Sequence, residues 1–262
     1  MDAHREIRRA FIALGYFTRI PIPGWVGWSP DELNRAARYF PLVGLLVGAA
    51  GALSLCIADA VWPGGVAVAL SMLVTVVLTG AFHEDGLADA ADGFGGGFEP
   101  DRVLTIMQDS RIGTYGAIAL VLALLIKFSA MVALVERHPG LAAVALVIAH
   151  AGSRAAALSV MVWLPYARTT GAAKAKPVAE GITDREWRIG AAIALLPLLL
   201  AGWFAPLTLL QGGAVVLAAL AVAWLAARYF RRRIGGYTGD CLGATQQLAE
   251  IVIYLVLGAA WL

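Results

Sequence analysis

An acidic, glycine-rich segment, HEDGLADAADGFGGG, occupies residues 83–97. If it is helical, Asp85, Asp89 and Asp92 stand at positions i, i+4 and i+7, so three carboxylates share one face. No basic residue lies among them, and alone they repel one another. Mg²⁺ prefers hard oxygen ligands and usually binds through a few carboxylates and the phosphates of a substrate. The pattern therefore indicates a magnesium–phosphate site, with Glu84 as a further ligand.

The glycines that follow the aspartates include Gly95 and Gly96, and they would let backbone amides approach a phosphate closely. The alternative is a solvated acidic loop with a glycine hinge. Because the three aspartates recur at helical spacing beside an apolar stretch, we favour the metal site.

A second motif, IMQDSRIGTYG, covers residues 106–116 and leads into another apolar stretch. Asp109 can complete a metal site, and Arg111 can pair with a phosphate oxygen. The helix expected from Thr114 would offer free amides to an anion. The alternative is structural, with Asp109 or Ser110 capping that helix and Arg111 reaching a lipid headgroup.

The composition places these motifs in a membrane protein. Hydrophobic residues make up 60% of the 262 positions and charged residues only 15%, which is more apolar than a soluble domain of this length can bury. The net charge of +2 is too small to indicate nucleic-acid binding. Cys56 and Cys241 have no metal-ligand spacing and are interpreted as structural.

Apolar stretches of roughly 20 residues are long enough to cross a bilayer as helices, and the chain has about seven of them. We therefore expect an all-α, polytopic protein that forms one domain over residues 1–262. Residues 1–39 are predicted to form an amphipathic segment at the interface, and residues 83–113 a glycine-rich loop that carries the site. The predicted spans are 40–62, 66–82, 114–135, 141–163, 189–210, 213–230 and 242–262.

The basic residues outside these spans lie on one side of the membrane, except Arg137. By the positive-inside rule, the N-terminus and the acidic segment are cytoplasmic and the C-terminus is outside. Arg168, Lys174 and Lys176 lie on the same side and could attract a polyanion, but membrane orientation explains them without a substrate, and we prefer that interpretation.

Ionisable residues within spans usually mark function, so Lys127, His150, Arg154 and Glu250 need an account. His150 and Arg154 are four residues apart and share a helix face. One interpretation is a cavity open to the cytoplasm that Arg154 and Glu250 line. An equally supported one is an Arg154–Glu250 ion pair that joins two helices. Lys127 receives no catalytic role.

The last span begins with the polar sequence GGYTGDCLGATQQLAE. Its spacing places Asp240, Gln247 and Glu250 on a polar stripe that enters the membrane from the cytoplasmic side. These residues are therefore candidates for substrate binding together with Arg154.

Four blocks carry a family likeness: FTRIPIP at 17–23, FHEDGLADAADGFGGG at 82–97, IMQDSRIGTYG at 106–116 and YTGDCLGATQQLAE at 237–250. Over nearly the whole chain they resemble the cobalamin (5′-phosphate) synthase family, the adenosylcobinamide-GDP ribazoletransferases. The resemblance implies a Mg²⁺-dependent reaction at the bacterial or archaeal inner membrane. In it, α-ribazole or its 5′-phosphate displaces GMP from adenosylcobinamide-GDP.

Residue by residue, the family's motifs fall on positions already singled out. The family's acidic signature falls on Glu84, Asp85, Asp89 and Asp92, and its second motif on Asp109 and Arg111. For the reaction we expect the acidic residues to hold Mg²⁺ and Arg111 to contact phosphate. The attacking hydroxyl needs a base, for which His83, Asp92 and Asp109 are the candidates. A histidine at a membrane surface is also often only an interfacial residue. The second motif also covers Gly113, and the late motif falls on Thr238, Gly239, Asp240, Gly243 and Glu250.

The resemblance implies that the partners are the two small-molecule substrates and membrane lipid. We expect no nucleic-acid partner. A homo-oligomer and contacts with other enzymes of the pathway are further expectations. Clustered aspartates also occur in CDP-alcohol phosphotransferases and in aspartate-rich prenyltransferases, as a chemical analogy. An ion-coupled transporter would use Lys127, Arg154 and Glu250 for coupling. A transporter has little use for an acidic surface segment, and the sequence shows no inverted repeat.

Overall fold

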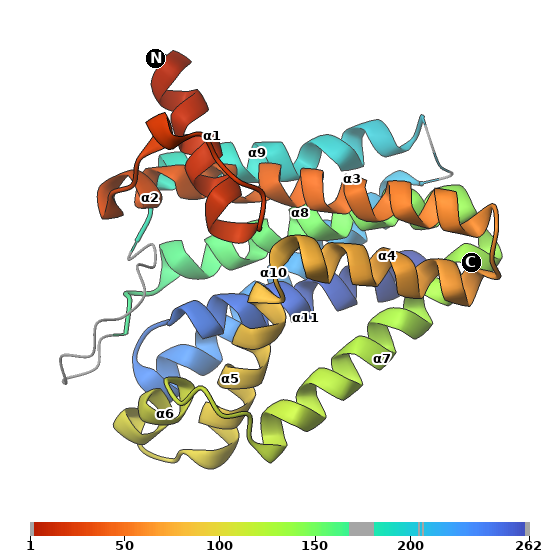
Figure 1. The fold of residues 1–262 in the computed structure, drawn as a ribbon. Helices are drawn as coiled ribbons and strands as arrows, with labels where there is room; N and C mark the ends of the chain where they lie inside the picture. Colours follow the sequence, from red (N-terminus) through yellow and green to blue (C-terminus); the bar gives the residue numbers. More distant parts are fainter. Residues whose placement is uncertain (1–2, 168–180, 204, 206, 260–262) are drawn as a thin grey trace.

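The computed structural model describes residues 3–167, 181–203, 205 and 207–259, and it is built from helices (Figure 1). The all-α prediction is confirmed. Within the described ranges the strand-like pairing is an isolated bridge between Tyr166 and Tyr237. The helices are α1 (Ala3–Phe17), α2 (Pro30–Ala36), α3 (Phe40–Asp59), α4 (Gly64–Thr79), α5 (Phe82–Gly96), α6 (Pro100–Met107), α7 (Thr114–Arg137), α8 (Pro139–Trp163), α9 (Asp184–Ala201), α10 (Leu209–Ile234) and α11 (Gly239–Gly258), with short 3₁₀ turns η1 (Gly24–Val26) and η2 (Ala37–Tyr39).

Helix α8 forms the centre of the bundle, where it packs against α3, α9, α10 and α11. In its most apolar window 72% of the residues are buried, against 11% in α10. The outer helices therefore leave leucines uncovered, and Leu125 on α7 and Leu217 on α10 are 55% and 70% exposed. Apolar side chains exposed on this scale are expected to face lipid rather than water.

Five helical segments are long and apolar enough to cross a membrane: α2 to α3 taken together, α7, α8, α10 and α11. Helix α4 passes the same test only when joined to α5, and these two helices are bent by 85°. The polytopic class is thus confirmed, with five or six candidate spans among the described helices where about seven were expected.

The predicted span at 189–210 differs from the helix found there. Helix α9 begins with charged residues at Asp184 and ends at Ala201. The next helix begins at Leu209, because Thr208 and Gln211 form a reciprocal capping box at its first turn. The predicted span continued across the end of α9 because it was drawn from apolar composition alone.

Three glycines let α3 lie directly against its neighbours. A Cβ atom built on Gly44 would lie 2.3 Å from the carbonyl oxygen of His150, and one on Gly48 would lie 2.7 Å from that of Leu146. On the other side, Gly51 accepts a hydrogen bond from the Ser71 hydroxyl of α4 at 2.8 Å. Small residues at spacing of four allow this close packing of helices in membranes.

The chain turns sharply between α4 and α5. Helix α4 ends at Gly80 with a left-handed φ of 65°, and Ala81 follows with φ 57°. The segment after α1 holds this turn, because the backbone N–H of Arg19 donates to the carbonyl of Leu78 at 2.9 Å. Helix α5 consequently leaves the direction of α4, as Figure 1 shows.

The N-terminal helices dock through ion pairs. Arg9 contacts Glu6 at 2.7 Å and Glu32 at 2.9 Å, and Arg38 contacts Glu186 of α9 at 2.7 Å. That residues 1–39 lie at the membrane interface stays a prediction.

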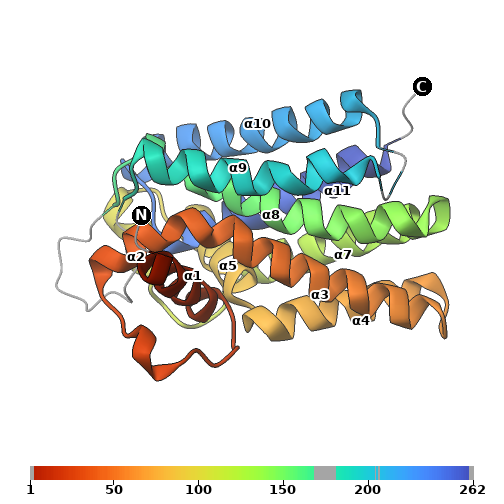
Figure 2. The ribbon, with the colours of Figure 1, turned by 90° about the horizontal axis from the view of Figure 1, so that it is seen from above.

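The two ends of the bundle carry opposite ends of the chain. Helix α1 lies at one end and the last turn of α11 at the other (Figure 2). Arg137 lies at the second end, where its guanidinium donates to the carbonyl of Gly258 at 2.7 Å. Which end faces the cytoplasm stays a prediction from the positive-inside rule.

The close contact of α3 and α8 gives a first prediction. We expect Gly44→Ala to destabilise the protein by about 1–3 kcal/mol, because the added methyl group overlaps the backbone of α8. The melting temperature in detergent should fall clearly below that of the wild type. Gly212→Ala is the control, since a Cβ there has open space around it; equal melting temperatures for the two variants would contradict the packing argument.

Candidate active site

The acidic segment is a helix in the structure, and the predicted loop at 83–113 is wrong. Helices α5 and α6 occupy most of it. Helix α5 crosses α11 so closely that a Cβ on Gly86 would lie 3.2 Å from the Cα of Gly243. This backbone contact fixes the acidic residues beside the first turns of α11, and it requires helical geometry that a loop would lack.

The helix separates its carboxylates into different surroundings. Glu84 accepts a hydrogen bond from Gln247 of α11 at 3.0 Å through Oε1. Its other oxygen, Oε2, is buried and has no partner among the described residues. Asp85 is exposed, and Asp89 is half-buried. Glu84 and Asp85 therefore present carboxylate oxygens that remain available to a ligand.

Asp92 has a different position and caps α7. It is 8% exposed. Its two oxygens accept from the backbone N–H groups of Gly113 and Gly116, at 2.7 and 2.8 Å. These amides have no partner within their own helix, so Asp92 performs the capping that we considered for Asp109 or Ser110. Its proposed role as a metal ligand stays a prediction.

The described residues contain no group of three or more His, Cys, Asp or Glu side chains close enough to hold a metal ion. The donors nevertheless suit Mg²⁺, because Glu84 Oε2 is an unpartnered buried oxygen and Asp85 is an exposed carboxylate on the next residue. Mg²⁺ commonly takes one or two carboxylates and completes its shell with water and substrate phosphate. The residues thus fit a site that the substrate completes.

The glycines after Asp92 are packed rather than mobile. A Cβ on Gly93 would lie 2.5 Å from Met107, and one on Gly95 would lie 2.5 Å from the ring of Tyr115. Gly96 is exposed and lines a shallow cavity together with Asp92, Asp109 and Arg111. Phosphate binding by Gly95 and Gly96 stays a prediction, and the structure gives Gly95 a packing role.

Asp109 and Arg111 pair with each other at the surface. The guanidinium of Arg111 donates to both carboxylate oxygens of Asp109, at 3.0 and 2.7 Å, and Arg111 is 87% exposed. These hydrogen bonds lower the pKa of Asp109 to about 2. A carboxylate with so low a pKa is a weak proton acceptor while Arg111 is bound to it.

Glu250 lies in a buried network, but its cation is not the expected one. Lys127 of α7 pairs with Glu250 at 2.9 Å, whereas Arg154 forms no ion pair with it. Gln246 and Tyr254 also donate to the carboxylate, at 2.7 and 3.2 Å. The predicted Arg154–Glu250 ion pair is therefore wrong, and Lys127, to which we assigned no catalytic role, is the cation that pairs with Glu250.

The network reaches the acidic helix through Gln247. Its amide oxygen accepts from Lys127 at 2.8 Å, and its amide nitrogen donates to Glu84 at 3.0 Å. A continuous set of hydrogen bonds thus runs from the interior of the bundle to Glu84. The sequence signal for Lys127 was its depth in a span, since a buried ammonium needs an acidic partner.

Arg154 lines a second cavity with aromatic walls. Its Nη1 donates to the carbonyl of His150 at 2.8 Å, and its Cζ lies 5.9 Å from the ring centre of Phe17. The ring of His83 stacks on the ring of Phe17, with the two ring centres 5.2 Å apart. The cavity is lined by Tyr16, Phe17, Phe40, Phe82, His83, Arg154, Ala157, Met161, Gly239, Leu242, Gly243 and Gln246.

The base candidates are therefore divided between two cavities. His83 lies in the aromatic cavity, whereas Asp92 and Asp109 line the shallow one near the start of α7. Asp240 is half-buried in the first turn of α11, after Thr238, whose hydroxyl accepts from the backbone N–H of Cys241 at 3.3 Å. Arg168, Lys174 and Lys176 fall outside the described residues.

Comparison with known proteins agrees with the sequence motifs. The model of the cobalamin-5-phosphate synthase family matches residues 9–258. The chain belongs to this family. A curated protein of Ralstonia nicotianae, named adenosylcobinamide-GDP ribazoletransferase, is 52% identical over 100% of this chain and 98% of its own length. No solved structure matches.

Two further relatives carry the same name. The protein of Ralstonia pickettii is 50% identical over 100% of this chain and 99% of its own length. That of Shewanella putrefaciens is 48% identical over 97% and 95%. The family resemblance drawn from the four sequence blocks is thus confirmed over the whole chain.

The different surroundings of Asp92 and Asp85 give a second prediction. Asp92→Asn places an amide donor where the start of α7 requires an acceptor, so we expect a loss of about 1–3 kcal/mol in stability. Asp85→Asn should leave the melting temperature unchanged, because that carboxylate is exposed. Thermal unfolding of both variants in detergent checks this, and an unshifted Asp92→Asn would remove the capping role.

The Lys127–Glu250 pair gives a third prediction. Lys127→Met leaves a buried carboxylate without its cation and should destabilise the protein by about 3–5 kcal/mol. Adding Glu250→Gln to that variant should restore much of the loss, because the uncompensated charge is then absent. If the double variant melted below Lys127→Met, the two residues would not be compensating each other.

Proposed function

We propose that this chain is a Mg²⁺-dependent adenosylcobinamide-GDP ribazoletransferase of the inner membrane, with its active face in the cytoplasm. The observation that supports this lies on α5, where Oε2 of Glu84 is buried without a partner among the described residues and the next residue, Asp85, carries an exposed carboxylate. The names of relatives at about half identity over the whole chain support the substrates.

In the proposed reaction a ribose hydroxyl of α-ribazole, or of its 5′-phosphate, attacks the phosphorus that carries cobinamide. The new O–P bond joins the two substrates, and the P–O bond to GMP breaks with its electrons on GMP. The hydroxyl proton passes to a base of the protein. The barrier of such a transfer is mainly electrostatic, because negative charge collects on the phosphoryl oxygens and the leaving group.

Residues of α5 would hold the metal, with Glu84, Asp85 and Asp89 as ligands and Asp92 beside them. When bound, Mg²⁺ neutralises phosphate oxygens and stabilises the departing phosphate. Arg111 is exposed, lines the shallow cavity and can contact a phosphate through Nη1, which its pair with Asp109 does not use.

The base is assigned by elimination between the two cavities. Both oxygens of Asp109 are held by Arg111, and Asp92 already accepts two backbone hydrogen bonds. His83 keeps Nε2 without a hydrogen-bond partner among the described residues. We therefore assign His83 as the proton acceptor. Membrane lipid, a homo-oligomer and neighbouring pathway enzymes belong to the proposal as partners.

A direct assay is the fourth prediction. Purified protein in detergent, supplied with adenosylcobinamide-GDP, α-ribazole 5′-phosphate and Mg²⁺, should release GMP. Asp89→Asn and removal of the metal should each lower the rate by about a hundredfold or more, the scale of losing a main electrostatic contribution. Asp101→Asn is the matched control, because Asp101 is an exposed carboxylate at the start of α6.

The outcomes separate the hypotheses. GMP release that requires Mg²⁺ and Asp89 supports the transferase with its metal on α5. A folded wild type that releases no GMP would overturn the proposal, and CDP-alcohol and prenyl diphosphate substrates would be tested next. Equal loss in Asp101→Asn would show that the effect of Asp89→Asn is not specific.

A further inference from the structure

We infer that the aromatic cavity binds the nucleotide acceptor, ribazole 5′-phosphate, with its phosphate at Arg154 and its base against the rings of Phe17 and its neighbours. The inference rests on the proposed transferase function and gives a place to one of its two substrates. It also makes α1 a wall of the substrate site, in addition to its expected position at the membrane interface.

Arg154 carries the argument for an anion. It is 2% exposed, and its Nε and Nη2 atoms are buried without hydrogen-bond partners among the described residues. No carboxylate in the described part of the chain forms an ion pair with it, because Glu250 is taken by Lys127. A buried cation with two unpartnered donor nitrogens is costly unless a ligand supplies an anion. A guanidinium with two adjacent donors suits a phosphate group.

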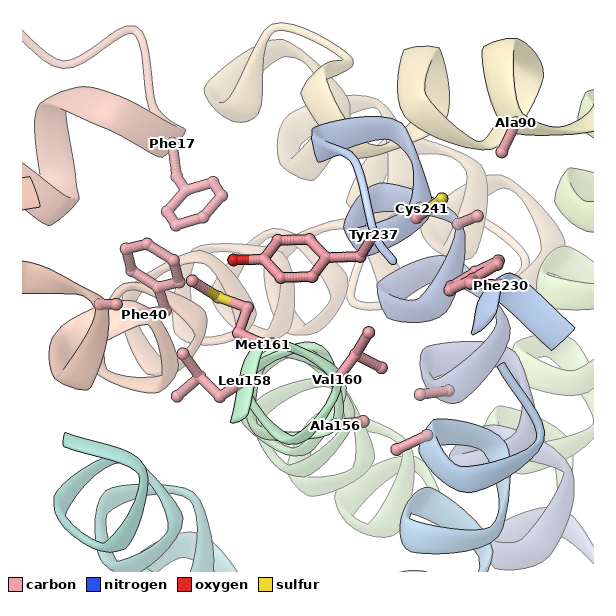
Figure 3. Close-up of a cluster of buried hydrophobic side chains, with 14 of the residues drawn as sticks. Phe17, Phe40, Ala90, Ala156, Leu158, Val160, Met161, Phe230, Tyr237 and Cys241 are labelled. Atoms are coloured by element: carbon pink, nitrogen blue, oxygen red, sulfur yellow. The ribbon is translucent and has the colours of Figure 1, made fainter. Parts of the chain in front are cut away.

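The walls of the cavity carry the argument for a flat aromatic group. Phe17 packs edge-on against Phe40, with ring centres 4.5 Å apart, and Phe82 lies 5.4 Å from Phe17. Figure 3 shows Phe17 and Phe40 facing one another beside Met161, with the hydroxyl of Tyr237 directed toward them. Aromatic rings bind other rings by stacking and by edge contacts.

The polar groups of the cavity favour ribazole over guanine. The guanine base has N–H donors on its edge and needs acceptors, whereas the dimethylbenzimidazole base of ribazole has none. Arg154 only donates. The amide of Gln246 is already used, since its nitrogen donates to Ser153 and Glu250 and its oxygen accepts from Gln247. Nε2 of His83 also lines the cavity without a partner among the described residues, but the proposed function uses it to accept the proton of the attacking hydroxyl. A base without N–H donors therefore suits this cavity better.

The position of the cavity agrees with a reaction at α5. Gly243 lines the cavity and touches Gly86 of α5, and His83 lines it one residue before Glu84. The cavity thus borders the crossing of α5 and α11, on the helix that carries Glu84 and Asp85. A nucleotide held at Arg154 is next to the proposed base and next to the proposed metal ligands.

The test is direct binding to the full-length protein in detergent, by isothermal titration calorimetry and without the second substrate, so it is independent of turnover. The ligands are α-ribazole 5′-phosphate, α-ribazole and GMP. In the wild type we expect the 5′-phosphate to bind about tenfold to a hundredfold more tightly than the nucleoside, the scale of charged hydrogen bonds. In Arg154→Gln this ratio should fall to about one, and Arg154→Lys should keep part of it.

Phe17→Leu tests the aromatic wall and remains informative if the Arg154 variants fail to fold. It should weaken both ribazole ligands roughly three- to tenfold and leave their ratio unchanged. Phe128→Leu is the matched control, because Phe128 packs in the other apolar cluster of the bundle, and it should bind like the wild type.

Three outcomes would overturn the inference. The first is an Arg154→Gln variant that still prefers the 5′-phosphate over the nucleoside as strongly as the wild type does. The second is a loss of ribazole affinity in Phe128→Leu equal to that in Phe17→Leu. The third is that Arg154→Gln weakens the binding of GMP and not that of ribazole 5′-phosphate. These results are distinct from failure of the proposed function. GMP release with normal ribazole binding in Arg154→Gln would preserve the transferase and refute this site.

Discussion

The site depends on the close approach of α5 and α11 at Gly86 and Gly243. Because neither residue has a side chain, the two backbones come within contact distance. A Cβ atom built on Gly86 would lie 3.2 Å from the Cα of Gly243. Gly243 lines the aromatic cavity, and Glu84 and Asp85 directly precede Gly86 on α5. A larger residue at either position would separate the helices and with them the two halves of the site.

Burial of charge is the second constraint on the structure. The bundle places Lys127, Arg154 and Glu250 where water is scarce, and it satisfies two of them with each other. Gln246 and Gln247 saturate the remaining donors and acceptors, as a buried polar network must. Arg154 alone of these three charges keeps buried N–H groups without partners among the described residues. A group that costs stability in this way is often kept for binding.

The acidic helix shows how one sequence pattern can contain two functions. Asp85 and Asp92 belong to the same periodic face in the sequence, yet Asp85 is exposed and Asp92 is buried against the start of α7. The bend after α4 decides this, because it turns α5 by 85° and brings its far end to Gly113 and Gly116. A carboxylate that ties two helices together is as necessary to the site as one that meets a ligand.

Much of this protein was determined by sequence alone. Hydrophobic composition fixed the membrane class and most helices, since apolar runs of sufficient length have few other stable arrangements. The spacing of Asp85, Asp89 and Asp92 predicted a helical acidic face, and four motifs predicted the family. These features are local, and the sequence contains them directly. The loop assignment at 83–113 failed because glycine content was interpreted as flexibility, whereas Gly86, Gly93 and Gly95 are contact positions.

Only the tertiary structure decided which charges meet. Sequence placed Arg154 and Glu250 at similar depth, but depth does not give the rotation of one helix against another, and Lys127 is the residue that faces Glu250. The same holds for Asp92, whose partners are 21 and 24 residues away. The aromatic cavity joins residues from α1, α3, α5, α8 and α11, and no local pattern brings these together because their proximity arises from packing alone.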